Sequence, residues 1–153
     1  MITLRDYYMG RNESHRGELT DQIAANAQTI VNRANILLTM FYEANPQAAR
    51  RNVRSGWRPA AVNAGTPNAA AHSKHLTAEA IDVEDNDREL AKWCAAKTKV
   101  LEAFEVWMER PEATPTWCHW QSGPPGSGVR YFWPNQTAYA AFQASGAAPM
   151  VAA

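Results

Sequence analysis

The chain has 153 residues, which is the size of one domain and too short for two full hydrophobic cores. Hydrophobic residues make up 46% of the chain and charged residues 20%, a balance that argues against a disordered protein. The 15 Lys and Arg are matched by 15 Asp and Glu, so the basic excess typical of proteins that bind nucleic acids or anionic membranes is missing.

Residues 1–19 are predicted to form a polar lead-in that carries two tyrosines. Apolar residues then recur at three- and four-residue steps over 23–41, which predicts one long amphipathic helix. Thr20 or Asp21 can cap its start. Asn45 ends the helix, because a residue that precedes proline avoids helical angles.

The rest of the chain reads as short strands and helices. The alternation at 78–85 predicts a strand in which Ile81 and Val83 face the core while Asp82 faces the other side. The other predicted elements are a short strand and turn at 50–59, a loop of small residues at 60–72, a helix capped by Asn86 or Asp87, a helix-to-strand segment at 100–108, strands at 117–121 and 129–133, and a helix at 135–145.

This order favours an α+β fold with a small antiparallel sheet flanked by helices. Neither a repeat nor a linker between domains is visible, so we expect a single domain over 1–145 and a flexible tail over 146–153. No apolar run approaches the roughly 20 residues of a membrane-spanning helix, and the N-terminus lacks the apolar core of a secretion signal. We therefore expect no membrane insertion and no nucleic-acid partner.

The two cysteines, Cys94 and Cys118, are too few for a framework of disulfides and are expected to be free thiols. Cys118 directly precedes His119 in a predicted strand. Since neighbouring residues of a strand point to opposite faces, this pair is not expected to form a catalytic thiol–imidazole couple.

A metal site is the chemistry that the histidines suggest. His75 lies on a predicted turn seven residues before Asp82, and His119 lies in the middle of a later strand. Imidazole and carboxylate are both zinc ligands, and three protein ligands leave a fourth position open for water. Spacing alone leaves a second interpretation open, in which these are loop residues and a core histidine.

Three segments in this order resemble the M15 family of zinc peptidases, which contains D-Ala-D-Ala carboxypeptidases and phage endolysins and shares its fold with the Hedgehog signalling domain. The segments are SGWRP at 55–59, SKHLTAEAID at 73–82 and WCHWQ at 117–121. The family's central pattern is Ser-x-His-x-x-Gly-x-Ala-x-Asp, which is matched by Ser73, His75, Ala80 and Asp82, with Ala78 where glycine is usual. The likeness runs over about residues 3–135 and is strongest to short members encoded by phages or prophages.

The resemblance implies a Hedgehog/DD-peptidase-like fold and zinc bound by His75, Asp82 and His119. It also implies that Arg58 faces the substrate and holds the scissile carbonyl or a terminal carboxylate. Many members carry the general base three residues before the last zinc histidine, where this chain has Thr116. We therefore expect Glu109, at the end of a strand, to be the base, with Glu112 in the following loop as the alternative.

Three further residues are candidates for contact with the substrate. Ser73 either forms a hydrogen bond within the site or caps its own turn. Gln121 shares the face of His119, and Trp57 either lines a groove or belongs to the core. His72 is either a substrate contact or an exposed loop residue.

The resemblance implies a zinc-dependent peptidase that hydrolyses a bond in the stem peptides of bacterial peptidoglycan. We expect a monomer that is made in the bacterial cytoplasm and acts in the periplasm or cell wall after release as an endolysin, or is carried in a virion. The alternative is a non-catalytic zinc-binding structural component of a phage particle, and the absence of an acid at Thr116 keeps that alternative open.

Overall fold

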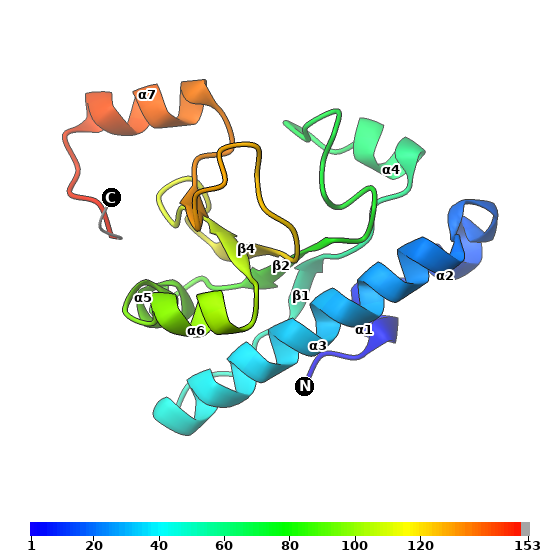
Figure 1. The fold of residues 1–153 in the computed structure, drawn as a ribbon, viewed down its shortest axis with the longest axis horizontal. Coiled ribbons are helices and arrows are strands. Elements are labelled where there is room, and N and C mark those ends of the chain that lie inside the picture. Colours follow the sequence, from blue (N-terminus) through cyan, green and yellow to red (C-terminus); the bar gives the residue numbers. More distant parts are fainter. Residues whose placement is uncertain (151–153) are drawn as a thin grey trace.

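A five-stranded sheet forms the centre of the computed structural model, which describes residues 1–150 (Figure 1). The strands lie in the order β1-β2-β4-β3-β5. Their bounds are β1 Val53–Ser55, β2 Ala80–Glu84, β3 Trp107–Glu109, β4 Trp117–Gln121 and β5 Tyr131–Phe132. The predicted α+β class is confirmed.

The sheet is mixed, so the prediction of an antiparallel sheet is wrong at one edge. The pairs β1–β2, β2–β4 and β3–β4 are antiparallel, whereas β5 pairs with β3 in parallel. The reason is topological. After β4 the chain turns back and runs in the opposite direction to β4, and β3 also runs opposite to β4, so β5 at the outer edge lies parallel to β3.

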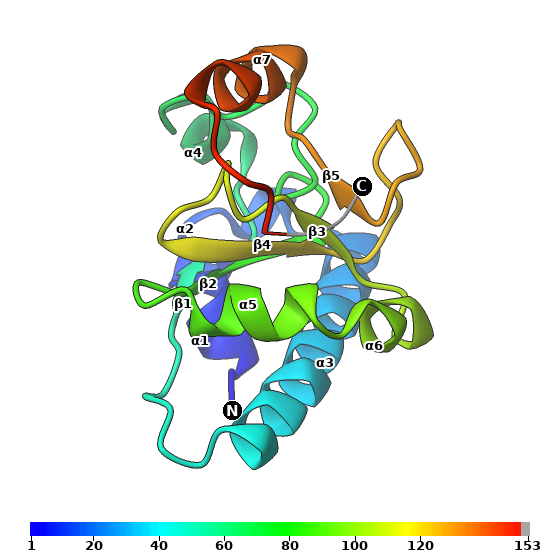
Figure 2. The same cartoon turned by 90° about the vertical axis from the view of Figure 1, so that its left-hand side faces the viewer.

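Helices cover both faces of the sheet. Figure 2 shows α3, α5 and α6 on one side and α4 and α7 on the other. The helical bounds are α1 Leu4–Tyr8, α2 Arg11–Ser14, a 3-10 turn Arg16–Glu18, α3 Asp21–Ala44, α4 Ala60–Ala64, α5 Glu89–Ala95, α6 Thr98–Ala103 and α7 Gln136–Ser145. None of the helices in the described part of the chain is long and apolar enough to cross a membrane.

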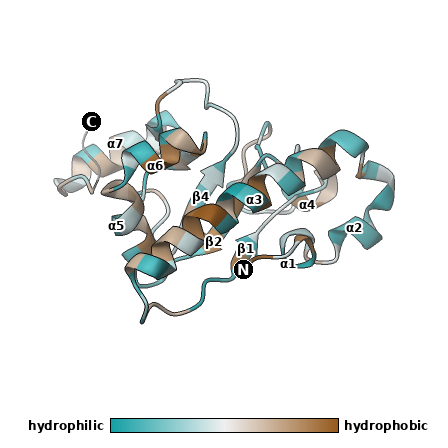
Figure 3. Ribbon diagram, turned by 60° about the horizontal axis from the view of Figure 1, so that its bottom comes forward, coloured by the Kyte–Doolittle hydropathy of each residue, from teal (hydrophilic) through white to brown (hydrophobic). Residues whose placement is uncertain are grey.

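The long helix α3 forms where the sequence predicts it. The side chain of Thr20 accepts a hydrogen bond from the backbone N–H of Ile23 at 3.2 Å and so caps the first turn. At the other end Asn45, which precedes a proline, leaves helical geometry, and its side-chain amide donates to the Phe41 carbonyl at 2.9 Å. The polar and apolar residues of α3 are visible in Figure 3.

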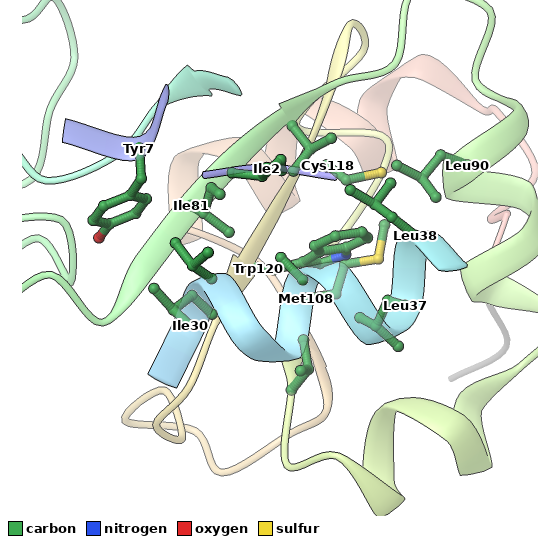
Figure 4. Close-up of a cluster of buried hydrophobic side chains, with 14 of the residues drawn as sticks. Ile2, Tyr7, Ile30, Leu37, Leu38, Ile81, Leu90, Met108, Cys118 and Trp120 are labelled. Carbon is green, nitrogen blue, oxygen red and sulfur yellow. The ribbon is translucent and has the colours of Figure 1, made fainter. Parts of the chain in front are cut away.

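The core lies between α3 and one face of the sheet (Figure 4). Strand alternation sends Ile81, Val83 and Trp120 into this core, and all three are fully buried. Each large apolar side chain removed from water contributes about 1.5–3 kcal/mol. The opposite face of the same strands is thereby left to polar residues, including Asp82 and His119.

The N-terminal segment differs from the predicted polar lead-in. It forms α1, α2 and the 3-10 turn, and Ile2, Tyr7 and Tyr8 are buried in the core. The hydroxyl of Tyr7 donates to the carbonyl of Ala80 at 3.0 Å, which ties α1 to β2. Helices of four or five residues are too short to show an apolar period, so the sequence pattern hides them.

Smaller corrections concern a loop and a strand, and one helix cap has a second contributor. The predicted loop at 60–72 contains α4, and the strand predicted at 129–133 shortens to two residues. Two carboxylates cap the start of α5: Asp87, as predicted, accepts from the N–H of Glu89 at 3.0 Å, and Asp85 accepts from the N–H groups of Leu90 and Ala91 at 3.0 and 2.8 Å.

Part of the expected tail at 146–153 is described. Met150 packs partly against the core, and its backbone N–H donates to the Glu112 carboxylate. Residues 151–153 lie outside the described residues.

Candidate metal centre

Two of the predicted ligands face each other across neighbouring strands. Asp82 on β2 pairs directly with His119 on β4. Since both point away from the core, the Asp82 carboxylate lies beside the imidazole, with Oδ1 2.8 Å from Nδ1 of His119. The register of two antiparallel strands therefore assembles half of the site.

The third ligand, His75, comes from the turn before β2. The ring is 1% exposed. Its Nε2 lies 3.3 Å from Asp82 Oδ2 and 3.3 Å from His119 Nδ1. Its Nδ1 lies 2.7 Å from the carbonyl oxygen of Gly56, which can only accept, so Nδ1 carries the proton and Nε2 presents its lone pair to the site.

One oxygen and two nitrogens from these residues lie within 4.8 Å of one another, which is a geometry that can hold one metal ion. The donor set fits zinc, because neutral imidazoles and a carboxylate are ligands that zinc takes in catalytic sites. His75 also has the carbonyl partner on its second ring nitrogen that metal-bound histidines usually have.

The electrostatics of the three residues are strongly coupled. Burial opposes ionisation of Asp82, but the His75 and His119 imidazoles and their hydrogen bonds outweigh it and hold the pKa of this carboxyl well below its usual range. Burial lowers the pKa of His75 below its ordinary value. Burial also disfavours charged His119, but Asp82, Glu109 and Gln121 together raise the pKa of this imidazole. Asp82 is thus ionised and His75 neutral at neutral pH, as ligation requires.

Glu109 belongs to the same row of paired residues across the sheet as Asp82 and His119. On β3, Trp107 pairs with Gln121 and Met108 with Trp120, and continuing this register by one residue places Glu109 opposite His119. Burial raises the pKa of Glu109, while the charge on His119 lowers it and that on Asp82 raises it. The carboxyl is therefore within electrostatic reach of two of the three ligands, as a general base for this site must be.

Arg58 is buried and lies near the Asp82 carboxylate. Its backbone N–H donates to the His75 carbonyl at 3.0 Å, and its Nη2 donates to Ser73 Oγ at 3.1 Å. No carboxylate within residues 1–150 lies at ion-pair distance from the guanidinium. Burial lowers the pKa of Arg58, and the nearby Asp82 carboxylate opposes that shift. The side chain keeps positive charge and unused donors beside the ligands.

Ser73 has both of the roles that the sequence left open, a hydrogen bond within the site and the capping of its own turn. Its hydroxyl accepts from Arg58 and, at 3.3 Å, from the backbone N–H of His75. It therefore caps the turn that carries a ligand and positions the arginine.

Gln121 and Trp57 support the site from within the protein. Gln121 is buried, donates to the Gly123 carbonyl at 2.6 Å and forms a side-chain hydrogen bond with His119. The assignment of Trp57 as a substrate contact is wrong, because its ring is fully buried against Tyr8 and its Nε1 donates to the Leu76 carbonyl.

The remaining candidates lie apart from the ligands. Glu112 accepts from the backbone of Met150, and His72 is an exposed loop residue. Cys118 points into the core, opposite to His119, and burial raises the pKa of its thiol. Both cysteines are free, as predicted.

Two contributors were missed by the sequence reasoning. Gly56 provides the carbonyl that orients His75, and Phe132 on β5 packs edge-on against the His119 ring with centroids 6.2 Å apart. Gly56 stands inside the SGWRP segment, whereas no sequence motif points to Phe132, because its position depends on the parallel pairing of β5.

Comparisons of the chain with family models, with curated proteins and with solved structures found no match.

Proposed function

We propose that the protein is a zinc-dependent peptidase that hydrolyses a bond in peptidoglycan stem peptides. The observation that carries this proposal is the convergence of His75, Asp82 and His119 on one face of the sheet, with Glu109 continuing the row. The half-buried Glu109 carboxyl in this row, whose pKa is raised by burial, supports a hydrolase over a structural site, because hydrolysis needs a base close to the metal.

The residues divide the work of amide hydrolysis between them. Zinc at this site would supply Lewis-acid activation of the carbonyl and of water. A carboxylate oxygen of Glu109 accepts a proton from the attacking water and returns it to the leaving amine. Arg58 offers its free N–H donors to the oxygen on which negative charge develops.

The substrate class rests on the resemblance of the three segments to M15 peptidases. That likeness supports a phage- or prophage-encoded enzyme that reaches the cell wall as an endolysin or within a virion. Peptide bonds in the wall are accessible to a small monomeric enzyme, and no nucleic acid or membrane is needed for the reaction.

The test combines metal content with hydrolysis of purified peptidoglycan. Zinc-loaded wild-type protein should bind about one zinc and release new amino groups, and mass spectrometry of the muropeptides identifies the bond that is cut. Glu109→Gln should retain zinc and lose activity by about 10²-fold or more. Glu112→Gln is the matched control, because it makes the same change in the alternative base, and it should keep activity.

The same assay addresses the second candidate function. A protein that binds zinc through His75, Asp82 and His119 but leaves peptidoglycan intact would support a non-catalytic structural component of a phage particle. Wild-type zinc content in alanine variants of these three residues would contradict the metal site itself.

A further inference from the structure

Arg54 occupies an irregular position on the edge strand. Val53 pairs with Val83 and Ser55 pairs with Asp82, so two steps along β1 oppose a single step along β2, and Arg54 is the extra residue of a β-bulge. A bulge redirects the side chain of its extra residue. Here the side chain reaches beyond the neighbouring strand β2 and contacts β4.

Two contacts fix the orientation of this side chain. The guanidinium carbon lies 4.5 Å from the centroid of the Trp117 ring, and Nη1 donates to Thr116 Oγ1 at 2.8 Å. Trp117 is two residues before His119 on β4 and therefore shares its face of the sheet, about 7 Å away along the strand. Arg54 is thereby held at one end of the polar face that carries the metal ligands.

The charge of Arg54 is not neutralised within the protein. Among residues 1–150 no carboxylate lies at ion-pair distance from it, and only Nη1 donates a hydrogen bond. Glu84, which pairs with Trp117, accepts instead from the amide of Asn52 at 3.1 Å. Since Arg54 is exposed, its free N–H groups are accessible from solvent.

We propose that Arg54 binds a carboxylate of the peptide substrate and determines specificity, and that Thr116 is the residue that positions it. A planar guanidinium can donate two parallel hydrogen bonds to a carboxylate, and stacking on Trp117 orders the side chain before the ligand arrives. This inference rests on the proposed peptidase function, and it gives a role to the position at which a catalytic acid was expected.

The carboxylate has two possible sources in a stem peptide, the C-terminus and the internal D-Glu residue. Four synthetic stem peptides separate them: one with both carboxylates free, one amidated at the C-terminus, one amidated at D-Glu and one amidated at both. Hydrolysis of each by zinc-loaded protein gives kcat/KM. Dissociation constants come from tryptophan fluorescence in zinc-loaded protein that carries Glu109→Gln, which slows consumption of the peptide.

With Arg54 in place, one of the two carboxylates should improve kcat/KM, and also affinity in the Glu109→Gln protein, by about tenfold over its amide. Arg54→Gln should abolish this preference, so that the peptides with free and with amidated carboxylates are bound and hydrolysed equally well. Thr116→Val should weaken the preference and Thr116→Ser should restore it. Arg5→Gln, the same charge change at an exposed position on α1, should leave the preference intact.

The outcomes separate the two proposals. A carboxylate preference that survives in Arg54→Gln, or no preference in the wild type, overturns the role of Arg54 even if the protein is an active peptidase. Absence of hydrolysis, together with a carboxylate-dependent affinity that Arg54→Gln removes, overturns the peptidase and supports the binding role of Arg54. Loss of the preference in Arg5→Gln as well would assign it to the general charge of the surface and overturn the specific role.

Discussion

The imidazole of His75 donates its Nδ1 proton to the carbonyl oxygen of Gly56 at 2.7 Å. This hydrogen bond joins the segment that follows β1 to the turn that precedes β2, and it aims Nε2 at Asp82 and His119. The carbonyl stays in place because the backbone at Gly56 packs directly on the backbone of Tyr7. The orientation of the candidate metal ligand His75 thus depends on the close approach of two backbone segments.

Gly56→Ala should disturb both folding and metal binding. A Cβ at this position would lie 1.9 Å from the carbonyl oxygen of Tyr7, so one backbone must move. We expect a loss of about 2–4 kcal/mol in the free energy of unfolding and a zinc affinity about 10- to 100-fold weaker. Gly65→Ala is the control, because its nearest contact would be an ordinary 3.6 Å. Urea unfolding and chelator competition measure both effects, and equal behaviour of the two variants would contradict this account.

Zinc should stabilise the folded protein through the three ligands. At a free zinc concentration about 1,000 times the dissociation constant, the linkage contributes about 4 kcal/mol and raises the midpoint of thermal unfolding. His119→Ala removes one candidate zinc ligand and should abolish most of the increase in the unfolding midpoint. His72→Ala is the control, because His72 is an exposed loop residue outside the three ligands, and it should keep the increase. Thermal unfolding with zinc and with a chelator makes the measurement, and an undiminished increase in His119→Ala would remove that residue from the site.

Local patterns were enough to predict the elements that carry the ligands. The apolar period and the Thr20 cap fix α3, and strict alternation fixes the two faces of β2 and β4. Once two strands pair in register, the positions of Asp82 and His119 follow from the same alternation. That part of the site is therefore encoded within short stretches of sequence.

The rest depends on contacts between distant segments. The buried position of Tyr7 follows from a hydrogen bond to Ala80, 73 residues away, which no local pattern reveals. The parallel pairing of β5 with β3 depends on the path of the chain around the sheet, and so does the contact of Phe132 with His119. The burial of Trp57, which excludes it from substrate contact, likewise results from packing of α1.

Ala78 should accept glycine but reject a β-branched residue. It is fully buried and holds a left-handed backbone with φ 56° in the turn between His75 and β2. Ala78→Gly relieves a backbone strain of about 1–2 kcal/mol. It also loses the burial of one methyl group, about 0.8 kcal/mol, and glycine loses more backbone entropy on folding, about 0.5–1 kcal/mol. These effects nearly cancel, so the free energy of unfolding should stay within about 1 kcal/mol of the wild type. Ala78→Val adds bulk and a stiff side chain and should cost about 2–4 kcal/mol. Urea unfolding compares the variants, and a wild-type stability for Ala78→Val would contradict the left-handed conformation.

Glu109 should destabilise the metal-free protein at neutral pH, because its half-buried carboxylate is partly removed from water in the folded state. Burial raises its pKa in the folded state above the ordinary value, so the folded state binds this proton more tightly than the unfolded state. The stability that this group contributes is fully present below the unfolded pKa and is lost as the pH rises through the folded pKa. Glu109→Gln, which keeps the shape without the charge, should therefore be more stable than the wild type at pH 7.

The pH dependence distinguishes this effect from a change in packing. At pH 4, where the carboxyl is largely protonated in both states, the stability gain of Glu109→Gln should shrink, because the variant then resembles the protonated wild type. Urea unfolding of chelator-treated protein at the two pH values makes the test, with Glu102→Gln on the exposed side of α6 as the control that should show no such change. A gain of equal size at both pH values would show that packing, and not the charge of Glu109, determines the difference.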